Sequence, residues 1–279
     1  MARIGNPLPV RGSRTRARST ISVVKVAAVQ HDIVWNDRDA NFERLAPRIG
    51  DAAASGVDLV VLTETFSTGF IVDVAEIGEP EGGPSAQFLA AQAAEHGVWV
   101  CGSCPEIPTD AAGGDRRPFN SFVFAGPDGT THRYRKIHSF TYGGEDKHFR
   151  AGDELTSLTI AGARVTPLVC YDLRFADEFW QCAAATDVFV VTANWPAPRR
   201  LHWQTLLQAR AIENLAYVVG CNRVGTGGGL DYTGDSRIVD PLGELLATAA
   251  GDETTLFGTV DPDRVTDVRA RFGFLDDRR

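Results

Sequence analysis

The chain has 279 residues, 43% of them hydrophobic, and this size and composition allow a sizeable buried core. Its formal net charge of −8 argues against a nucleic-acid partner or an anionic membrane surface, because both need clustered Lys and Arg. No apolar run reaches the ~18–20 residues that span a bilayer, so we expect no membrane partner.

The first 22 residues differ from the rest in charge. They hold no Asp or Glu, show no apolar periodicity and include Arg3, Arg11, Arg14, Arg16 and Arg18. Taking this +5 from the total of −8 leaves −13 for residues 23–279. We interpret residues 1–22 as a disordered basic arm and residues 23–279 as the folded domain. An upstream start outside the folded body is one alternative for the arm. A transit peptide is another, although no amphipathic helix is evident.

The first part of this domain alternates strands and helices. Continuous apolar runs predict strands at residues 23–30, 57–62 and 98–103, and helical spacing predicts helices at residues 41–54 and 85–96. A hairpin is predicted at residues 120–134, around the turn sequence Gly-Pro-Asp-Gly. Near-continuous apolar strands of this kind are typical of a sheet that is covered by helices.

The second part repeats this alternation. After a loop at residues 137–152, we expect strands at 155–160, 164–170, 188–192, 217–222, 236–240, 244–247 and 256–260. Helices are expected at residues 176–184, 201–214 and 262–271, and the Gly-rich residues 225–229 indicate a flexible loop. The sequence predicts an α/β fold of one domain, a four-layer α-β-β-α sandwich of two mixed sheets packed face to face with helices outside.

Three chemically useful residues stand at predicted strand ends. Glu64 directly follows residues 57–62, where partial desolvation suits a carboxylate to general-base work. The alternative is a solvated acid that opens a loop. Lys136 follows the strand of the hairpin, and its alternative is a basic strand end that faces water.

The third residue is Cys170, in the run Val169-Cys170-Tyr171-Asp172-Leu173-Arg174. A thiol between a strand and a short helix lies near helix N–H groups, which favour the thiolate. The N–H of Tyr171 is also placed to stabilise an oxyanion. The alternative is an inert buried thiol, and we expect Arg174 to form a structural ion pair with Asp172.

The other motifs do not indicate a redox site, a metal site or a set of disulfides. Cys101 and Cys104 have C-x-x-C spacing, but they lie within a predicted strand rather than at the helix start of a redox site. The His residues lack zinc-binding spacing, and residues 225–230 do not fit the nucleotide-binding pattern G-x-G-x-x-G, because Leu230 occupies its last position. We therefore expect no metal and no organic cofactor. Five cysteines are too few and too sparse for a disulfide framework, which favours a cytoplasmic location.

The order Glu64, Lys136, Cys170 resembles the nitrilase superfamily of carbon–nitrogen hydrolases over residues 23–271. The resemblance implies the nitrilase type of four-layer sandwich and a catalytic triad on those three residues. It also implies a further glutamate near the substrate at Glu145, in the run Gly143-Gly144-Glu145-Asp146. Family members are commonly dimeric, so we expect a homodimer or a higher homo-oligomer.

Within the superfamily, the chain is most similar to the bacterial omega-amidase branch. Three runs carry this resemblance: Asn194-Trp195-Pro196-Ala197-Pro198-Arg199, Leu201-His202-Trp203-Gln204 and Gly220-Cys221-Asn222-Arg223. It implies hydrolysis of a small linear amide, such as 2-oxoglutaramate, through a thioester on Cys170. In this interpretation Glu64 is the base, while Lys136 and the N–H of Tyr171 hold the oxyanion.

A carboxylate at the far end of such a substrate needs a cation. Arg199 is our candidate for this contact. Trp195 and Tyr171 are expected to line the substrate pocket. Residues 137–144 depart from the pattern of bacterial relatives, so an N-carbamoyl amino acid amidohydrolase or a nitrilase stays open as an alternative. A catalytically idle binding module is a third possibility, against which the intact Glu64, Lys136 and Cys170 argue.

Overall fold

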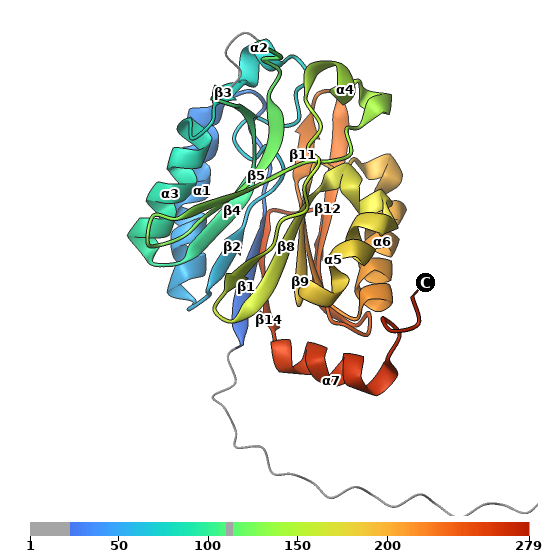
Figure 1. Cartoon of the computed structure of the whole chain (residues 1–279). Helices are drawn as coiled ribbons and strands as arrows, with labels where there is room; N and C mark the ends of the chain where they lie inside the picture. The colour runs from blue at the N-terminus through green and yellow to red at the C-terminus, as the bar shows by residue number, and fades with distance from the viewer. Residues whose placement is uncertain (1–22, 110–113, 279) are drawn as a thin grey trace, which may run out of the picture.

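The computed structural model describes residues 23–109 and 114–278. The predicted basic arm, residues 1–22, lies outside the described residues. In the part that is described, two mixed sheets of seven strands each pack face to face, with helices on their outer sides (Figure 1). This is the four-layer α/β architecture that the sequence predicts.

The first sheet has the order β14-β1-β2-β4-β5-β6, with β3 beside β4. Strands β1, β2 and β4 run parallel, while β14 comes from the far end of the chain and pairs antiparallel with β1. The strand bounds are β1 (Val24–Gln30), β2 (Leu59–Val61), β3 (Glu79–Pro80), β4 (Trp99–Ile107), β5 (Phe119–Ala125), β6 (Thr131–Arg135) and β14 (Thr254–Val260).

The second sheet has the order β11-β12-β10-β9-β8-β7, with β13 beside β12. Its central strands β8, β9 and β10 are parallel. The strand bounds are β7 (Leu158–Ile160), β8 (Ala163–Val169), β9 (Val188–Ala193), β10 (Tyr217–Asn222), β11 (Val224–Gly227), β12 (Leu230–Val239) and β13 (Leu245–Ala250).

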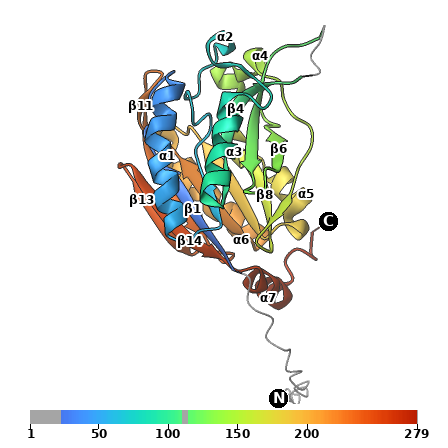
Figure 2. The same ribbon diagram turned by 90° about the vertical axis from the view of Figure 1, so that its left-hand side faces the viewer.

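Helices cover the outer face of each sheet. Helices α1 (Arg38–Ala54) and α3 (Pro84–His96) lie side by side on the first sheet (Figure 2), and α5 (Ala176–Cys182) and α6 (Arg200–Asn214) lie on the second. Helix α7 (Pro262–Phe272) lies at the opposite end of the molecule from the short helices α2 (Val74–Ile77) and α4 (Glu145–His148). No described helix is long and apolar enough to cross a membrane.

Strand β1 explains how the layers are held together. Because successive side chains of a strand point to opposite faces, Val24, Val26 and Ala28 lie in the core between the sheets. Ala27 and Val29 instead pack with the helices of the first sheet. Residues 26–29 are buried on both faces and are all apolar, which accounts for this run in the sequence, whereas Lys25 is exposed.

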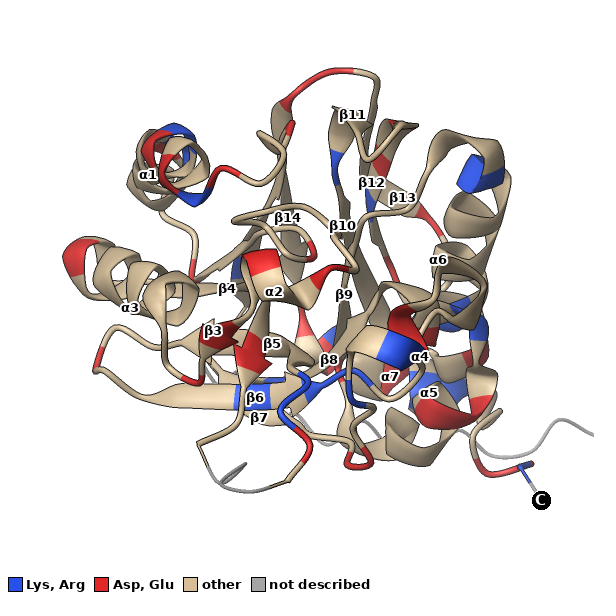
Figure 3. Ribbon diagram, turned by 90° about the horizontal axis from the view of Figure 1, so that it is seen from above, with Lys and Arg blue, Asp and Glu red and all other residues tan. Residues whose placement is uncertain are grey.

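The carboxyl ends of the parallel strands meet at one end of the molecule. Figure 3 views this end from above, with α2 and α4 lying over the strand ends. Glu64 follows β2, Lys136 follows β6, Cys170 follows β8, and Asn194 follows β9. The two-sheet topology therefore brings residues that are far apart in the sequence to a single place.

Three local predictions are wrong. Residues 225–229 form the end of β11 and a hairpin turn rather than a flexible loop, because Gly228 and Gly229 both adopt the positive φ that a tight turn requires. Helix α1 begins three residues early, where the Asp37 side chain accepts a hydrogen bond from the N–H of Ala40. Residues 137–152 contain the 3₁₀ turn η1 (Thr141–Gly143) and α4.

Candidate active site

Cys170 lies at a sharp change of backbone direction. Strand β8 ends at Val169, and Cys170 begins a 3₁₀ turn, η2 (Cys170–Arg174), with φ of +47°. Residues other than glycine rarely adopt this conformation, and it persists only when neighbouring contacts hold it. Here the carboxylate of Asp172 accepts hydrogen bonds from the N–H of Val169 and from the Tyr134 hydroxyl.

The Cys170 thiol is neutral at rest. Burial raises its pKa well above the ordinary value, and the Glu64 carboxylate raises it further through its charge and a hydrogen bond. The ammonium group of Lys136 opposes this increase but does not cancel it. The sequence suggested that nearby helix N–H groups favour a thiolate at Cys170. The raised pKa indicates a neutral thiol instead, and this thiol needs a base to take its proton.

Glu64 is the carboxylate beside this thiol. It is almost fully buried, at 1% exposure, and three donors hold its two oxygens. The Nζ of Lys136 lies 3.1 Å and the Nδ2 of Asn120 lies 2.8 Å from Oε1, while the backbone N–H of Asn194 donates to Oε2 over 2.7 Å. These three contacts fix the direction of the carboxylate.

Lys136 is a buried cation between two carboxylates. Its Nζ lies 3.0 and 2.9 Å from the two oxygens of Glu145, in addition to its contact with Glu64. Burial alone lowers the pKa of Lys136, but the negative charges of Glu145 and Glu64 outweigh burial and raise it. The side chain therefore stays charged at any working pH and can face a developing oxyanion.

Glu145, the first residue of α4, lies behind Lys136. Its carboxylate also accepts hydrogen bonds from the N–H of Phe140 and, over 3.4 Å, from Asn120. It is not among the described residues that line the cavity. Its contacts hold the Lys136 ammonium and the loop of Phe140 in place.

Sequence reasoning missed two asparagines at this site. The Nδ2 of Asn120 bridges the two glutamates, and Asn194 binds Glu64 through its backbone N–H and, over 2.6 Å, through Nδ2 to the Glu64 carbonyl. Asn194 was visible as a residue that follows an apolar strand. Asn120 lies at the start of an apolar strand, and nothing in the sequence around it indicated a role. Its partners, Glu64 and Glu145, are 56 and 25 residues away.

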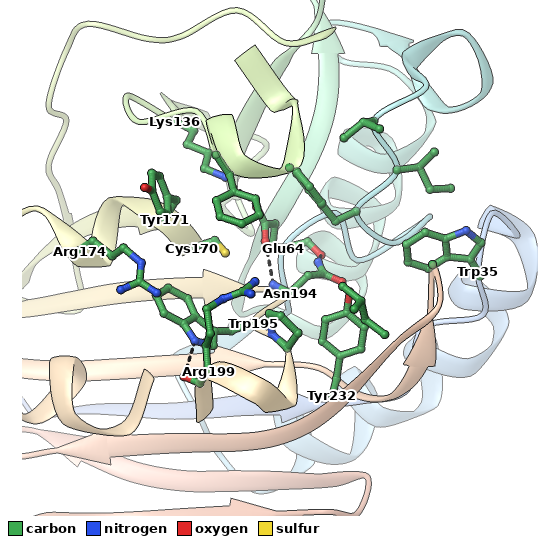
Figure 4. A pocket seen from close by; sticks show the side chains of 18 of the residues that line it. Trp35, Glu64, Lys136, Cys170, Tyr171, Arg174, Asn194, Trp195, Arg199 and Tyr232 are labelled. Atoms are coloured by element: carbon green, nitrogen blue, oxygen red, sulfur yellow. Dashed lines mark hydrogen bonds and ion pairs between the residues drawn. The ribbon is translucent and has the colours of Figure 1, made fainter. Parts of the chain in front are cut away.

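A cavity of about 390 Å³ opens beside Cys170, Glu64 and Lys136 (Figure 4). Tyr171 and Trp195 line it, as the sequence predicts, and so does Arg199. Trp195 is held by hydrogen bonds from its backbone N–H to Asn222 and from its indole N–H to the Arg199 carbonyl. The cavity therefore brings together all three expected substrate-binding residues.

Arg174 also lines the cavity, which contradicts the expected ion pair with Asp172. The Asp172 carboxylate is satisfied instead by Tyr134, Val169 and His138. The Arg174 guanidinium lies 4.7 Å from the centre of the Trp195 ring. Within residues 23–109 and 114–278, neither Arg174 nor Arg199 forms an ion pair with a carboxylate, although a nitrogen of the Arg174 guanidinium lies 3.2 Å from Nδ1 of His202. Both guanidinium groups can therefore still bind an anionic ligand.

The arrangement has the parts of a nucleophilic catalyst. A thiol lies beside a carboxylate and an ammonium group that are both held in place, in a cavity that two guanidinium groups also line. Attack of such a thiol on a carbonyl carbon needs a base and a stabilised oxyanion, and both are present. The described residues contain no cluster of three or more His, Cys, Asp or Glu suited to a metal ion.

Comparisons with known proteins agree with this geometry. The family model for carbon–nitrogen hydrolases matches residues 25–270. Omega-amidase YafV of Escherichia coli is 38% identical over 234 residues, which cover 83% of this chain and 87% of that protein. The 2-oxoglutaramate amidase of Bacillus subtilis is 28% identical over 257 residues, with 91% of this chain and 97% of that protein covered.

A solved structure extends the match to the fold. XC1258 of Xanthomonas campestris, a carbon–nitrogen hydrolase superfamily protein with an arsenic adduct in its active site, is 33% identical to this chain. The two structures align with a TM-score of 0.85 over 92% of this chain and 97% of that one. The two-sheet arrangement described above is therefore the one that this superfamily shares.

Proposed function

This chain belongs to the carbon–nitrogen hydrolase family, and we propose that it is an omega-amidase that acts on 2-oxoglutaramate or a similar omega-amide of a dicarboxylic acid. Membership in the family and the amidase relatives make it a cysteine-dependent hydrolase of carbon–nitrogen bonds other than peptide bonds. The observation that carries the proposed substrate class is that Arg174 and Arg199 line the same cavity as Cys170 and form no ion pair with a carboxylate of the described residues.

In the proposed mechanism, Glu64 takes the proton of the Cys170 thiol while the sulfur attacks the amide carbon. The carbonyl oxygen becomes an oxyanion, which the Lys136 ammonium and the backbone N–H of Tyr171 stabilise. Losing one such donor typically costs about 10²–10³ in rate. When the tetrahedral intermediate collapses, the C–N bond breaks, Glu64 returns its proton to the nitrogen, and ammonia leaves.

The acyl group is then bound to Cys170 as a thioester. Glu64 takes a proton from a water molecule, whose oxygen attacks the thioester carbon, and the same two donors hold the second oxyanion. The C–S bond breaks, the sulfur recovers its proton from Glu64, and the carboxylic acid is released. Glu145 acts as a positioning residue in both steps, because it contacts Lys136 rather than the cavity.

The far carboxylate of the substrate binds Arg199, assisted by Arg174. Both side chains are half-buried, both line the cavity, and both lack a protein carboxylate among the described residues. A charge-assisted contact with a carboxylate supplies such a guanidinium group with the partner it lacks. Figure 4 shows Tyr171 and Trp195 on the same side of Cys170 as Arg174.

The test of the substrate class is ammonia release from four compounds. These are 2-oxoglutaramate, succinamate, an N-carbamoyl β-amino acid and a simple nitrile. We expect turnover of the two omega-amides. Turnover of the carbamoyl compound alone, or of the nitrile alone, would replace this proposal with one of the two sister activities.

The thioester is tested by mass spectrometry of the intact protein quenched during turnover. We expect an adduct equal to the substrate minus ammonia in the wild type and none in Cys170→Ala, which should also lose all turnover. Cys182→Ala is the matched control, because Cys182 lies on α5 outside the cavity and should leave the adduct unchanged. Turnover by Cys170→Ala would refute the mechanism.

We also propose that the enzyme works in the cytoplasm as a homodimer or a higher homo-oligomer. All five cysteines are free, which supports a reducing compartment. Large apolar side chains are exposed on and near α6 and β13, which supports self-association: Leu201, Ile212, Leu242, Leu245 and Leu246. Light scattering on the purified protein tests the oligomer, and a monomer at working concentration would refute it.

A further inference from the structure

The cavity has an apolar side that the proposed reaction does not use. We name as the apolar wall six residues that line it: Trp35, Phe70, Ile71, Val72, Leu230 and Tyr232. Figure 4 shows Trp35 and Tyr232 on the opposite side of Cys170 from Arg174. Arg174 and the apolar wall therefore lie on opposite sides of the reactive thiol.

The apolar wall is assembled from three separate segments. Trp35 precedes α1, Phe70–Val72 lie in the segment between β2 and α2, and Leu230 and Tyr232 belong to β12 of the second sheet. The phenol of Tyr232 is 7% exposed, and burial raises its pKa to about 12. It therefore faces the cavity as a neutral aromatic group.

Trp35 is fixed by close approach of the backbone on two sides. A Cβ added at Gly69 would lie 2.6 Å from its ring, and one added at Gly228 would lie 2.8 Å from it. Both glycines have positive φ, so the two segments bring bare backbone against the indole. The Asn36 N–H also donates to the Thr68 carbonyl, which joins the Trp35 segment to the Gly69 segment.

A linear dicarboxylate amide leaves this wall uncovered. Its amide occupies the Cys170 end and its carboxylate occupies the arginine side, and it has no side group to place elsewhere. Cavities of about 300–1,000 Å³ are the size that buries much larger ligands, and this cavity of about 390 Å³ falls in that range. A fixed aromatic and aliphatic wall gains most from an apolar group that leaves water to contact it.

We propose that the apolar wall binds a hydrophobic side group on the acyl chain of the substrate. The preferred substrates are then omega-amides of dicarboxylic acids that carry a branched alkyl or aromatic substituent. This inference rests on the proposed function, because the positions of the amide and the carboxylate come from it. The acyl chain is the assigned position because, in the proposed mechanism, the amide nitrogen faces Glu64, which returns a proton to it.

The test compares three ligands by calorimetry with Cys170→Ala, which binds without turnover. They are succinamate, succinamate with a benzyl group on the carbon next to its carboxylate, and N-benzylsuccinamate. We expect the carbon-substituted compound to bind about tenfold or more tightly than succinamate, as apolar contacts of this size give. Equal affinities would overturn the inference, and tighter binding of the N-benzyl compound would overturn the assignment to the acyl chain.

Variants test whether the apolar wall causes the difference in affinity between succinamate and its carbon-substituted benzyl derivative. Trp35→Ala and Leu230→Ser, each combined with Cys170→Ala, should bring the affinity ratio close to one, and Trp35→Phe should restore part of it. Leu230 is 45% exposed, so its replacement is not expected to disturb folding. Trp180→Ala is the matched control, since Trp180 is a tryptophan on α5 outside the cavity. A ratio that survives both wall variants would overturn the inference.

Wild-type turnover of the same ligands separates the two proposals. Ammonia released equally well from succinamate and its benzyl derivative would refute the apolar wall as a specificity site and leave the omega-amidase function standing. Tight binding of the benzyl derivative without ammonia release from either compound would refute the omega-amidase function. In that case the wall would stand as a ligand-binding site of a different enzyme.

Discussion

The backbone N–H of Asn194 donates a hydrogen bond of 2.7 Å to Oε2 of Glu64, although the two residues follow strands of different sheets. Glu64 comes after β2, and Asn194 comes after β9, 130 residues later. The direction of the carboxylate is therefore set by how the two sheets pack against each other. A small shift between the sheets would turn the base away from the Cys170 thiol.

Asn120→Ala should lower kcat by about 10–100-fold with little change in KM. The variant removes a donor from the Glu64 carboxylate, and a hydrogen bond to a charged group contributes about 1.5–3 kcal/mol. Asn120 does not line the cavity, so substrate binding should be retained while proton transfer to Glu64 becomes slower. Steady-state ammonia release over a range of substrate concentrations gives both parameters.

The matched control for Asn120 is Asn214→Ala. Asn214 is also fully buried and donates through Nδ2, but to the Arg210 carbonyl at the end of α6, away from the cavity. It should cost stability and leave kcat near the wild-type value. An Asn120→Ala enzyme with the wild-type kcat, or with a raised KM and an unchanged kcat, would contradict a positioning role.

Glu64→Gln should lose activity and at the same time make the Cys170 thiol more acidic. The negative charge of Glu64 and its hydrogen bond both raise the thiol pKa, whereas the Lys136 ammonium lowers it. Removing the charge leaves the effect of Lys136 less opposed, so the pKa of Cys170 falls. A pH titration of thiolate absorbance in the ultraviolet, corrected with Cys170→Ala, measures this shift, and an unchanged or higher pKa would be inconsistent with it.

Asp172 should make the protein less stable as the pH rises from about 4 to about 6. Burial raises the pKa of its carboxyl from 3.8 to about 6, although Lys136 and three donors, two of them backbone N–H groups, oppose the increase. Between these values the folded state keeps a proton that the unfolded state has released, so the free energy of unfolding falls with pH. A shift of about two units corresponds to a loss of about 3 kcal/mol.

The comparison that isolates Asp172 is urea unfolding of the wild type and of Asp172→Asn over this pH range. The variant cannot titrate at this position. The free energy of unfolding of the wild type minus that of the variant should therefore decrease from about pH 4 to about pH 6 and then become constant. A difference that stays constant over the whole range would show that Asp172 does not titrate with a raised pKa.

The parts of the fold that could be predicted were those with long local patterns. The core of strand β1 is buried on both faces, so it was visible in the sequence as an apolar run. Gly97 marked the end of α3, because glycine readily adopts the left-handed conformation that this helix end has. Helix α4 has only four residues, too few to show helical periodicity. The turn at Gly228 and Gly229 was missed because its glycines interrupt the alternation that marks a hairpin.

The site shows the same difference between residues with a readable local pattern and residues that distant contacts position. Glu64, Lys136 and Cys170 each follow a strand, and that position is readable from the sequence around them. Trp35 reaches the cavity only because two distant segments close around it. The role of Arg174 was misjudged because Asp172, two residues away, looked like its partner, whereas the turn points the carboxylate toward Tyr134 and the guanidinium toward Trp195.

Arg199→Gln should raise KM for an omega-amide by about 10–100-fold and change kcat much less. The guanidinium contributes a charge-assisted contact to the far carboxylate, and loss of such a contact costs about 1.5–3 kcal/mol. A neutral amide of similar length, such as butyramide, should be affected little, because it has no carboxylate to lose. Initial rates over a range of concentrations of both substrates give the two parameters.

Arg200→Gln is the control for this charge, since Arg200 is the next residue and an arginine as well. Its guanidinium forms an ion pair with Asp235 at 2.8 Å and does not line the cavity, so KM should stay near the wild-type value. If Arg199→Gln alters KM for butyramide as much as for succinamate, the residue shapes the cavity rather than binding the carboxylate. In that case Arg174, whose guanidinium lies over the Trp195 ring, is the remaining cation of the cavity that can bind the substrate carboxylate.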